Sequence, residues 1–551
     1  MPVSLWLCLP FAAVAASISL LPATPHLFLD ADGIAASANL SFTLGEPLKN
    51  YTSPAISREY PWEEILHFYT SALLVPGSPN TYRIYYSCYT PNSAMYVCVA
   101  ESVDSFSFTK PLNAQFLFNG SLTNRVFLVN ASSPGSWPGS VFIDTRAGVP
   151  ASEKFKLTYE GAAGEREMYI ATSPDGITWA RRTPEVPVIA DRLFSDTQTA
   201  VVYDATSSRY FAFGRADDDL PGNTTAGCYG AYPSLRRVIL AVSNTSADGP
   251  YSDPVQVLGP GAPDDVNCLD MYNPGPIAVP GALLLQPSSY RHFAATDAIP
   301  NGSSPVNDGI LDVRLAVSRD GLNYSFISRD PFIRRGVGYR DPNLGSFTLL
   351  DSEPDAGFVF SVAGGLMDPD SLSPRPPSPF PYTVPSAQVG LLYWGAQRTH
   401  GGHGTSPGFQ GVLRASLRRE GFASASSPLG DPLGSAAFRT TPIVVPQPAV
   451  ACGASDSSLW LLLNVRTGVA GSVAVTFLDP DTQLPLPGFD IPLPFTGNAV
   501  RAPVGWATVN DPENPVAHDI GPLAGQAVVV NVALVHADLY AWEVQCVPAS
   551  A

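Results

Sequence analysis

Carboxylate side chains recur in this sequence next to predicted β-strands, at positions from which they could act on one substrate. In four-stranded units that radiate from a common axis, first strands begin and second strands end at the same face. Residues at those two places should therefore converge. Before the first strands stand Glu63 and Glu64, Trp137, Ser195 and Asp196, Asp270 and Tyr272, and Arg340 and Asp341. After the second strands stand Glu160, Arg215 and the run Tyr290-Arg291-His292.

Converging carboxylates suit the cleavage of a glycosidic bond. One protonates the leaving oxygen, and another acts as a base or a nucleophile at the anomeric carbon. We predict four catalytic residues, Glu63, Glu160, Asp196 and Asp270. The predicted reacting pair is Asp196 with Asp270 or Glu63, and Glu160 is an alternative acid. The competing interpretation is that an aspartate before a strand only caps a turn.

Aromatic and cationic side chains near these carboxylates could bind a sugar. Trp62 and Trp137 could stack on sugar rings, although packing in the core explains each of them equally well. The other predicted substrate-binding residues are Arg215, Tyr272, Arg291, Arg340, Asp341 and His400. His400 and His403 have the spacing of a weak metal pair, but we expect a loop at the mouth of the site and no metal or other cofactor.

A repeated strand and turn organises the first four fifths of the chain. An apolar strand is followed by Ser, then usually by Asp-Gly and often by an aromatic residue. The copies lie at Tyr96–Phe108, Tyr169–Trp179, Ile239–Gly249, Leu315–Tyr324 and, more loosely, Val412–Phe422. Asp can cap backbone N–H groups and Gly adopts a positive φ, so each copy predicts a tight turn. The first three intervals are about 70–75 residues, which indicates repeated four-stranded units.

Each copy is preceded by two further strand candidates. The first strands are predicted at Tyr69–Val75, Ser140–Ile143, Thr197–Tyr203, Gly275–Val279 and Leu344–Leu350. The second strands are predicted at Tyr82–Cys88, Phe155–Tyr159, Tyr210–Gly214, Ala282–Gln286 and Gly357–Val362. Asp368–Pro385 reads as a loop insertion in the fifth unit, and Phe28–Leu48 as the source of a closing strand. The predicted fold is all-β, a five-bladed β-propeller followed by a β-sandwich.

The predicted organisation is a signal peptide over residues 1–23, a propeller over 24–435 and a sandwich over 436–551. The apolar N-terminus ends in small residues, although it lacks a basic start, so an uncleaved anchor is the alternative. Six cysteines follow it, and we predict the pairs Cys88–Cys98, Cys452–Cys546 and, by elimination, Cys228–Cys268. Eight Asn-x-Ser/Thr sequons precede the last domain. We therefore expect a secreted or cell-surface glycoprotein.

The charge balance restricts the partners. The formal net charge is -17, and an acidic surface argues against binding to nucleic acid or to an anionic membrane. After removal of a signal peptide we expect no membrane contact, because no later segment is long and apolar enough to cross a bilayer. A carbohydrate is the expected partner, and the protein is expected to be a monomer.

The chain resembles exported proteins, common in planctomycete-type bacteria, that are described as similar to the N-terminal domain of glycoside hydrolase family 32. The shared segments are Leu27–Asp32, Tyr60–Glu63, Ser140–Asp144, Ser195–Gln198, Gly411–Phe422, Pro487–Phe489, Pro494–Gly497, Leu523–Gly525 and Ala537–Trp542. The resemblance implies a five-bladed propeller of the arabinanase and invertase type. Two invertase motifs, Trp-Met-Asn-Asp-Pro-Asn-Gly and Glu-Cys, are absent, and Arg340-Asp341-Pro342 lies in the wrong unit. Fructan hydrolysis is therefore not supported.

Three functions remain open from the sequence. The leading one is a glycoside hydrolase that acts on a poly- or oligosaccharide. The second is a carbohydrate-binding propeller without catalysis, and the third is a structural protein of the cell surface. An enzyme needs two carboxyl groups roughly 5–10 Å apart, whereas a binding module needs aromatic platforms and few buried acids.

Overall fold

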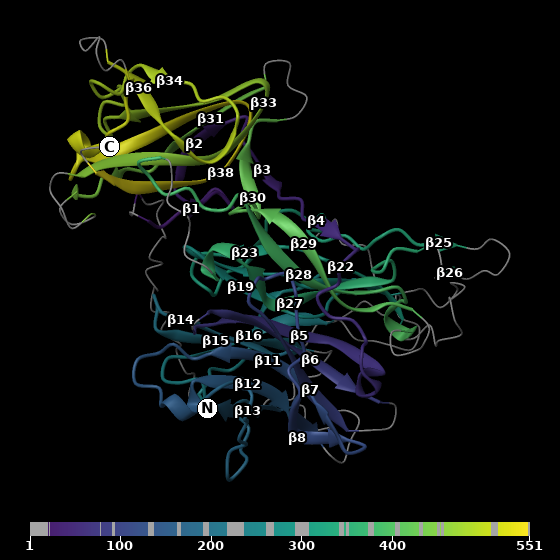
Figure 1. Ribbon diagram of the computed structural model, residues 1–551. Helices are drawn as coiled ribbons and strands as arrows, with labels where there is room; N and C mark the ends of the chain where they lie inside the picture. Colours follow the sequence, from purple (N-terminus) through teal and green to yellow (C-terminus); the bar gives the residue numbers. More distant parts are fainter. Residues whose placement is uncertain are drawn as a thin grey trace, which may run out of the picture. The chain divides into compact units, whose positions relative to one another are not determined.

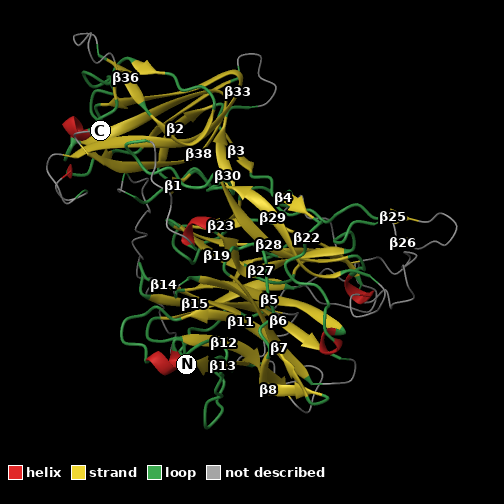
Figure 2. Cartoon of the chain, in the orientation of Figure 1, coloured by secondary structure: helices red, strands yellow, loops and turns green. Residues whose placement is uncertain are grey.

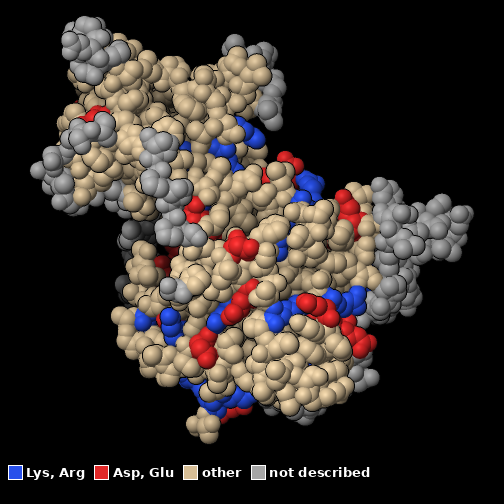
Figure 3. Space-filling view, viewed as in Figure 1, with Lys and Arg blue, Asp and Glu red and all other residues tan. Residues whose placement is uncertain are grey.

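In the computed structural model almost all of the regular secondary structure is β-strand (Figure 2), which confirms the predicted all-β class. It describes residues 20, 23–77, 79–90, 94–130, 137–161, 167–190, 198–216, 236–260, 269–292, 308–340, 347–348, 352–372, 380–402, 408–428, 434–448, 452, 457–508 and 516–548. On the face shown in Figure 3, most of the described surface is uncharged, in keeping with a charged content of only 14%. Within those ranges no helix has the length and apolar character needed to cross a membrane.

The chain divides into two compact units. Unit 1 comprises Met1–Phe42, Pro379–Val384 and Ser424–Ala551, and unit 2 comprises Thr43–Ser378 and Pro385–Ala423. The N-terminal strands and a short inner segment therefore belong with the C-terminal part of the chain.

Unit 2 consists of successive antiparallel meanders (Figure 1), as the repeated strands and turns predict. The first contains β5 (Ile65–Val75), β6 (Thr81–Tyr89), β7 (Met95–Ser102) and β10 (Arg125–Asn130). The second contains β11 (Pro138–Ile143), β12 (Phe155–Glu160) and β13 (Met168–Ser173), and the third contains β14 (Ala200–Asp204), β15 (Arg209–Ala216), β16 (Arg237–Ser243) and β17 (Val255–Leu258). A hairpin of β8 (Asn113–Phe118) and β9 (Ser121–Thr123) precedes β10.

The fourth meander bends, so that each of its long strands is split in two. Its strands are β18 (Leu269–Met271), β19 (Pro276–Val279), β20 (Ala282–Leu285), β21 (Ser288–His292), β22 (Gly309–Val313), β23 (Ala316–Ser318) and β24 (Ser325–Phe326). The last meander contains β27 (Phe358–Met367), β28 (Gln388–Ala396), β29 (Gln410–Arg418) and the N-terminal strand β4 (Leu48–Asn50). Between these two, β25 (Tyr339–Arg340) and β26 (Phe347–Thr348) form a small ribbon.

The first strands of the meanders contact one another in a closed cycle, in the order β5, β11, β14, β19, β27 and back to β5. Glycine permits the close approach between β19 and β27. Gly275, just before β19, has φ +50°, and a Cβ added there would lie 2.0 Å from Oγ of Ser361 in β27. Asn273 donates a hydrogen bond of 2.6 Å to the same Oγ. Small and polar side chains thus hold β19 and β27 together.

The apolar cores lie between successive meanders. One buried cluster combines Val97 and Val99 of the first meander with Leu157 and Ala171 of the second. Equivalent clusters join the second meander to the third, the third to the fourth, and the last to the first. Each buried Val, Leu or Phe contributes about 1.5–3 kcal/mol through loss of contact with water. The meanders therefore stabilise one another face to face.

The predicted Ser-x-Asp-Gly turns form as expected. In the second meander, Oδ1 of Asp175 accepts hydrogen bonds from the backbone N–H groups of Ile177 and Thr178 and from Oγ of Ser173. The Ser173 Oγ in turn accepts from the backbone of Gly176, whose φ is +75°. The same hydrogen bonds recur around Asp320 and Gly321 in the fourth meander.

Two sequence-based expectations for the last meander were wrong. β27 is its innermost strand, because Ala363 pairs in parallel with Ser71 of β5, whereas the sequence placed a second strand there. The insertion after Met367 separates β27 from its partner β28, and this distance along the chain hid their pairing. The closing strand is β4 at Leu48–Asn50, which pairs with β29. Ile34–Ala38, earlier in the predicted range, pairs within unit 1 instead.

Unit 1 is organised by two strands of 22 residues, β33 (Ser457–Leu478) and β38 (Ala527–Pro548), which pair along their length. Its sheet also contains β1 (His26–Leu27), β2 (Ile34–Ala38), β3 (Ser41–Leu44), β30 (Ala423–Ser426), β31 (Ser435–Thr440), β32 (Ile443–Val444) and β35 (Asn498–Pro503). A smaller sheet contains β34 (Pro492–Leu493), β36 (Gly505–Ala507) and β37 (Val516–Ala517). Leu459 and Val475, from opposite halves of β33, share one core.

Two of the predicted disulfides are confirmed. Cys88–Cys98 joins β6 to β7, with 5.9 Å between the Cα atoms, and Cys452–Cys546 closes unit 1 with a Cα separation of 5.7 Å. Cys228 and Cys268 lie outside the described residues, so their pairing stays a prediction.

Candidate functional site

A fully buried carboxylate, Asp270 of β18, lies at the centre of a polar cluster in unit 2. Its Oδ2 is 2.7 Å from Nε2 of His292 in β21, and its Oδ1 accepts a hydrogen bond of 3.1 Å from the backbone N–H of Arg236. The Arg236 Nε is 3.8 Å from Oδ2. An Asp–His contact of this kind can orient the imidazole and support proton transfer through it.

Two arginines lie against the ring of Tyr272, one residue beyond β18. The guanidinium carbons of Arg215 and Arg236 are 4.5 and 4.8 Å from the ring centroid. His400 lies between two tyrosines, with Nε2 3.3 Å from the hydroxyl of Tyr272 and Nδ1 3.3 Å from that of Tyr290. Burial raises the pKa of Tyr290 well above its ordinary value, so this phenol stays protonated.

A second carboxylate, Glu160, ends β12 beside Trp137. The backbone N–H of Trp137 donates to Oε2 of Glu160 at 3.3 Å, and the backbone N–H of Glu160 donates to the Trp137 carbonyl at 2.9 Å. The imidazole of His67 stacks on the indole, with 4.2 Å between centroids. Glu160 is buried and Trp137 only half-buried. A partly exposed aromatic side chain therefore lies next to a buried carboxyl group here.

Aromatic contacts connect these two groups. Tyr69 of β5 contacts Trp137, with 5.7 Å between ring centroids, and Phe360 of β27, at 6.0 Å. Phe360 in turn contacts Tyr272 at 5.5 Å. The cluster therefore receives side chains from meanders far apart in the sequence, at the end where the first strands begin.

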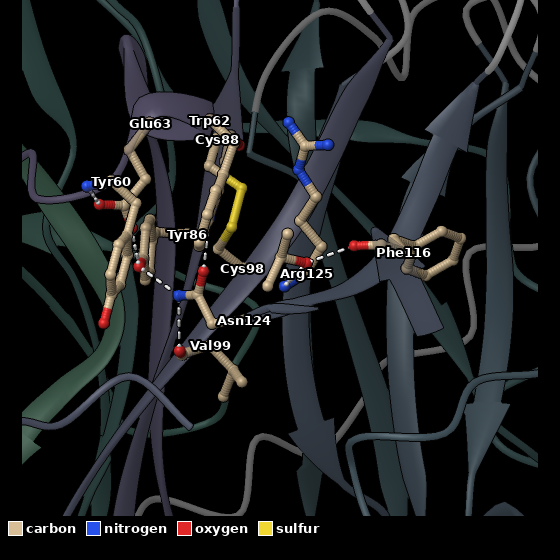
Figure 4. The surroundings of a disulfide bond; sticks show 12 residues. Tyr60, Trp62, Glu63, Tyr86, Cys88, Cys98, Val99, Phe116, Asn124 and Arg125 are labelled. Atoms are coloured by element: carbon tan, nitrogen blue, oxygen red, sulfur yellow. Dashed lines mark hydrogen bonds between the residues drawn. A yellow bond between two sulfur atoms is a disulfide. The ribbon is translucent and has the colours of Figure 1, made fainter. Parts of the chain in front are cut away.

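Glu63 and Trp62 instead make contacts within the first meander (Figure 4). Glu63 accepts hydrogen bonds from Tyr86 at 2.6 Å, from Lys110 at 2.7 Å and from two backbone N–H groups. Trp62 donates to Asn124 at 2.9 Å and stacks on Tyr60. Both side chains are buried, Glu63 completely. These contacts favour a structural role, the alternative that the sequence left open for Trp62.

The structure brings together six of the predicted site residues. They are Trp137, Glu160, Arg215, Asp270, Tyr272 and His400. Arg291 is exposed, because its neighbours Tyr290 and His292 point inward and side chains alternate along a strand. Asp196, Asp341 and His403 lie outside the described residues, and so does the side chain of Arg340.

Sequence reasoning missed His67 and Arg236. Arg236 stands just before β16, the third strand of its meander, which pairs antiparallel with β15 so that Val238 lies opposite Arg215. A third strand must therefore begin at the face where the second ends. The sequence analysis considered only residues before first strands and after second strands. Residues before third strands lie at the same face, and including them would have identified Arg236. Among the described residues, no group of three or more His, Cys, Asp or Glu side chains is placed to hold a metal ion.

No family model matches the chain, and a search of curated proteins found no relative. Among solved structures, an N-acetylgalactosamine deacetylase from F. plautii in complex with blood group B trisaccharide matches at a TM-score of 0.42 and 12% identity, over 70% of this chain and 97% of that one. An α-L-arabinofuranosidase from Podospora anserina in complex with cellotriose matches at 0.37 and 12%, over 69% and 98%. An endo-arabinase from Bacteroides thetaiotaomicron matches at 0.33 and 10%, over 67% and 97%.

Proposed function

We propose that unit 2 is a five-bladed β-propeller that hydrolyses glycosidic bonds of a poly- or oligosaccharide. Each meander would be one blade. The closed cycle of contacts through β5, β11, β14, β19 and β27 supports five blades around one axis. In this proposal the polar cluster around Asp270 lies at the end of the inner strands, where ligands of propellers bind.

The observation that carries the catalytic proposal is the presence of two buried carboxylates, Asp270 and Glu160, in one continuous cluster with aromatic rings. The imidazole of His292 and the guanidinium group of Arg236 lie beside the carboxylate of Asp270, which is the proposed base or nucleophile. Glu160, beside Trp137, is the proposed general acid. Asp196 stays part of the proposal as the second carboxylate at the anomeric carbon. Glu63 is left out because four hydrogen bonds already hold it.

The proposed setting is extracellular, with a cleaved signal peptide and glycosylated loops. The disulfides Cys88–Cys98 and Cys452–Cys546 support this proposal, because such bonds persist in oxidising compartments.

One observation favours a second candidate, a carbohydrate-binding propeller without catalysis. Both oxygens of Asp270 already have protein partners, so its carboxylate could serve to hold His292 and Arg236 in place. In that case the cluster would bind a sugar without cleaving it.

The test is turnover of plant and algal polysaccharides by the purified protein and by the variants Glu160→Gln, Asp196→Asn and Asp270→Asn. Each carboxylate that takes part in proton transfer or nucleophilic attack should lose at least about 100-fold in rate when neutralised. Folding is followed by circular dichroism in parallel. Unchanged turnover in folded Asp270→Asn would reject its catalytic role. Binding of a saccharide with no turnover would favour the second candidate.

A further inference from the structure

Four aromatic side chains contact one another in series in unit 1, and we call them the aromatic row. They are Phe380, Tyr382, Trp460 and His518. The ring centroids of successive members are 5.4, 5.8 and 4.7 Å apart. All four belong to the same compact unit, although the first two come from the insertion that follows β27 in the chain. The row is therefore assembled from three separate segments of sequence.

β33 and β38 hold the row on the face opposite their core. Leu459 and Leu461 of β33 point into the core, so Trp460 between them points away from it. Gln545 of β38, which pairs with Trp460, fixes the inserted segment. Its side-chain amide accepts a hydrogen bond of 2.7 Å from the backbone N–H of Thr383 and donates one of 3.1 Å to the Thr383 carbonyl. The inserted segment is thus joined to the sheet through a side chain.

The row is anchored at Tyr382 and exposed on both sides of it. Tyr382 is buried and packs against Leu462 of β33 and Val547 of β38. Phe380 is 52% exposed, and the last two members of the row are half-buried. Aromatic surface that keeps contact with water along such a series of rings is typical of a binding site.

Two ring nitrogens of the row have no partner within the described part of the chain. Nδ1 of His518 is 2.6 Å from the carbonyl oxygen of Val504, which can only accept a hydrogen bond. In the neutral imidazole the hydrogen is therefore on Nδ1, and Nε2 is an acceptor that no described residue engages. The indole N–H of Trp460 likewise has no acceptor among the described residues. The row thus offers one donor and one acceptor, both uncharged, beside its aromatic surfaces.

These groups suit an uncharged saccharide. The face of an aromatic ring carries negative partial charge, so it attracts the weakly positive C–H groups on the face of a pyranose ring. Sugar hydroxyl groups both donate and accept hydrogen bonds, which matches the imidazole acceptor and the indole donor. A stable protein partner needs about 800 Å² from each side, which is more than three partly exposed rings present. The row therefore fits a small ligand better than a protein.

We propose that the aromatic row is a second saccharide-binding site, which binds a neutral oligosaccharide of pyranose units. Phe380 and Trp460 stack on sugar rings, and Nε2 of His518 accepts a hydrogen bond from a sugar hydroxyl group. The site lies wholly within unit 1, so it is independent of the carboxylates proposed for hydrolysis in unit 2. It holds a polysaccharide on the protein whether or not that polysaccharide is cleaved.

The experiment is calorimetric binding of cellohexaose, xylohexaose and mannohexaose to the full chain. At least one hexasaccharide should bind, and Trp460→Ala should weaken its binding by at least about 10-fold, because the largest stacking surface is lost. Trp460→Tyr should recover part of the affinity through its ring. His518→Ala should weaken binding by about 2- to 10-fold, the effect of one neutral hydrogen bond. Leu484→Ala, at an exposed apolar residue of unit 1 outside the row, is the matched control and should change nothing.

A variant in unit 2 separates this site from the proposed hydrolytic site. Trp137→Ala should still bind the hexasaccharide, because the row is intact. A protein that binds a hexasaccharide through the row and cleaves no saccharide would keep this inference and reject hydrolysis. Cleavage together with binding that is undiminished in folded Trp460→Ala would reject this inference and keep hydrolysis.

Footprinting of the unmodified protein covers the case in which a variant fails to fold. A bound hexasaccharide should protect Phe380 and Trp460 from oxidation by hydroxyl radicals, whereas Leu484 should be oxidised as before. Absence of binding by all three hexasaccharides, or binding without protection of Trp460, overturns the inference.

Discussion

The hydroxyl of Tyr86 donates a hydrogen bond of 2.6 Å to Oε1 of Glu63, and both side chains are fully buried. The other carboxylate oxygen accepts from Lys110 at 2.7 Å, and the Lys110 side chain is only 6% exposed. This carboxylate therefore connects the start of the first strand to β6 and to the segment before β8. Removing the charge of the Glu63 carboxylate should therefore lower the stability of the folded protein.

We expect Glu63→Gln to lower the free energy of unfolding by about 3 kcal/mol, because it leaves the buried ammonium group of Lys110 without its closest charge partner. Urea unfolding followed by tryptophan fluorescence measures the change. The exposed neighbour Glu64 is the matched control, and Glu64→Gln should stay within about 0.5 kcal/mol of the parent. A Glu63→Gln variant as stable as the Glu64→Gln variant would contradict the assignment.

The two disulfides should contribute unequally. They close loops of very different length, with sequence separations of 10 for Cys88–Cys98 and 94 for Cys452–Cys546. Because the entropy lost by the unfolded chain grows with loop length, we expect removal of the first to cost about 2.5–3 kcal/mol and of the second about 4.5–5 kcal/mol. Paired Cys→Ser variants in denaturant unfolding test this order. Equal losses of unfolding free energy in the two variants would show that loop length does not determine how much each disulfide stabilises this protein.

Acid should loosen the repeated turns. The pKa of Asp104 is lowered to about 2, and that of Asp175 is also lowered, because backbone and serine hydrogen bonds to these carboxylates outweigh the effect of burial. Since the folded pKa lies below the unfolded value, this contribution is complete above about pH 4 and is lost as the pH falls toward 2. Melting temperatures recorded from pH 5 to pH 2 should therefore fall less steeply for the double variant Asp104→Asn, Asp175→Asn than for the parent. Asp253→Asn, an exposed aspartate outside these turns, should keep the parent's slope.

The contact between β19 and β27 should tolerate no side chain at Gly275. Alanine there must adopt φ +50° and overlap with Ser361, so we expect Gly275→Ala to destabilise unit 2 by about 3 kcal/mol or more. Gly120, in the hairpin between β8 and β9, has φ +81° but open space around it. Gly120→Ala therefore measures the cost of a positive φ alone, which should lower the free energy of unfolding by about 1 kcal/mol. Similar thermal shifts for the two variants would mean that the close approach is not required.

The sequence predicted those features that local chemistry determines. The Ser-x-Asp-Gly turns formed where expected, because their hydrogen bonds join residues two or three apart, as at Asp175. The short hairpin at Cys88–Cys98 could be predicted for the same reason. Asp270, Tyr272 and Glu160 could be predicted to lie at the same end of the strands because strand ends alternate regularly between two faces.

Features that depend on distant partners could not be predicted. Glu63 stands at the right end of its strand, but Tyr86 and Lys110, which come later in the chain, enclose its carboxylate. The inner position of β27 depends on parallel pairing with β5, almost 300 residues earlier. No pattern within β27 distinguishes a first strand from a second. Both are apolar runs of similar length.

The pairing of β1 with β38 has a consequence for synthesis. His26 and Leu27 pair with Trp542 and Ala541 of β38. The first described strand therefore cannot pair with its partner until almost the whole chain has been synthesised. β4 likewise has no partner until β29 has been made. A chain that emerges from the ribosome N-terminus first must therefore keep its leading strands unpaired for most of translation. Chaperones that shield exposed strand edges should matter more for this protein than for one whose units are continuous in sequence.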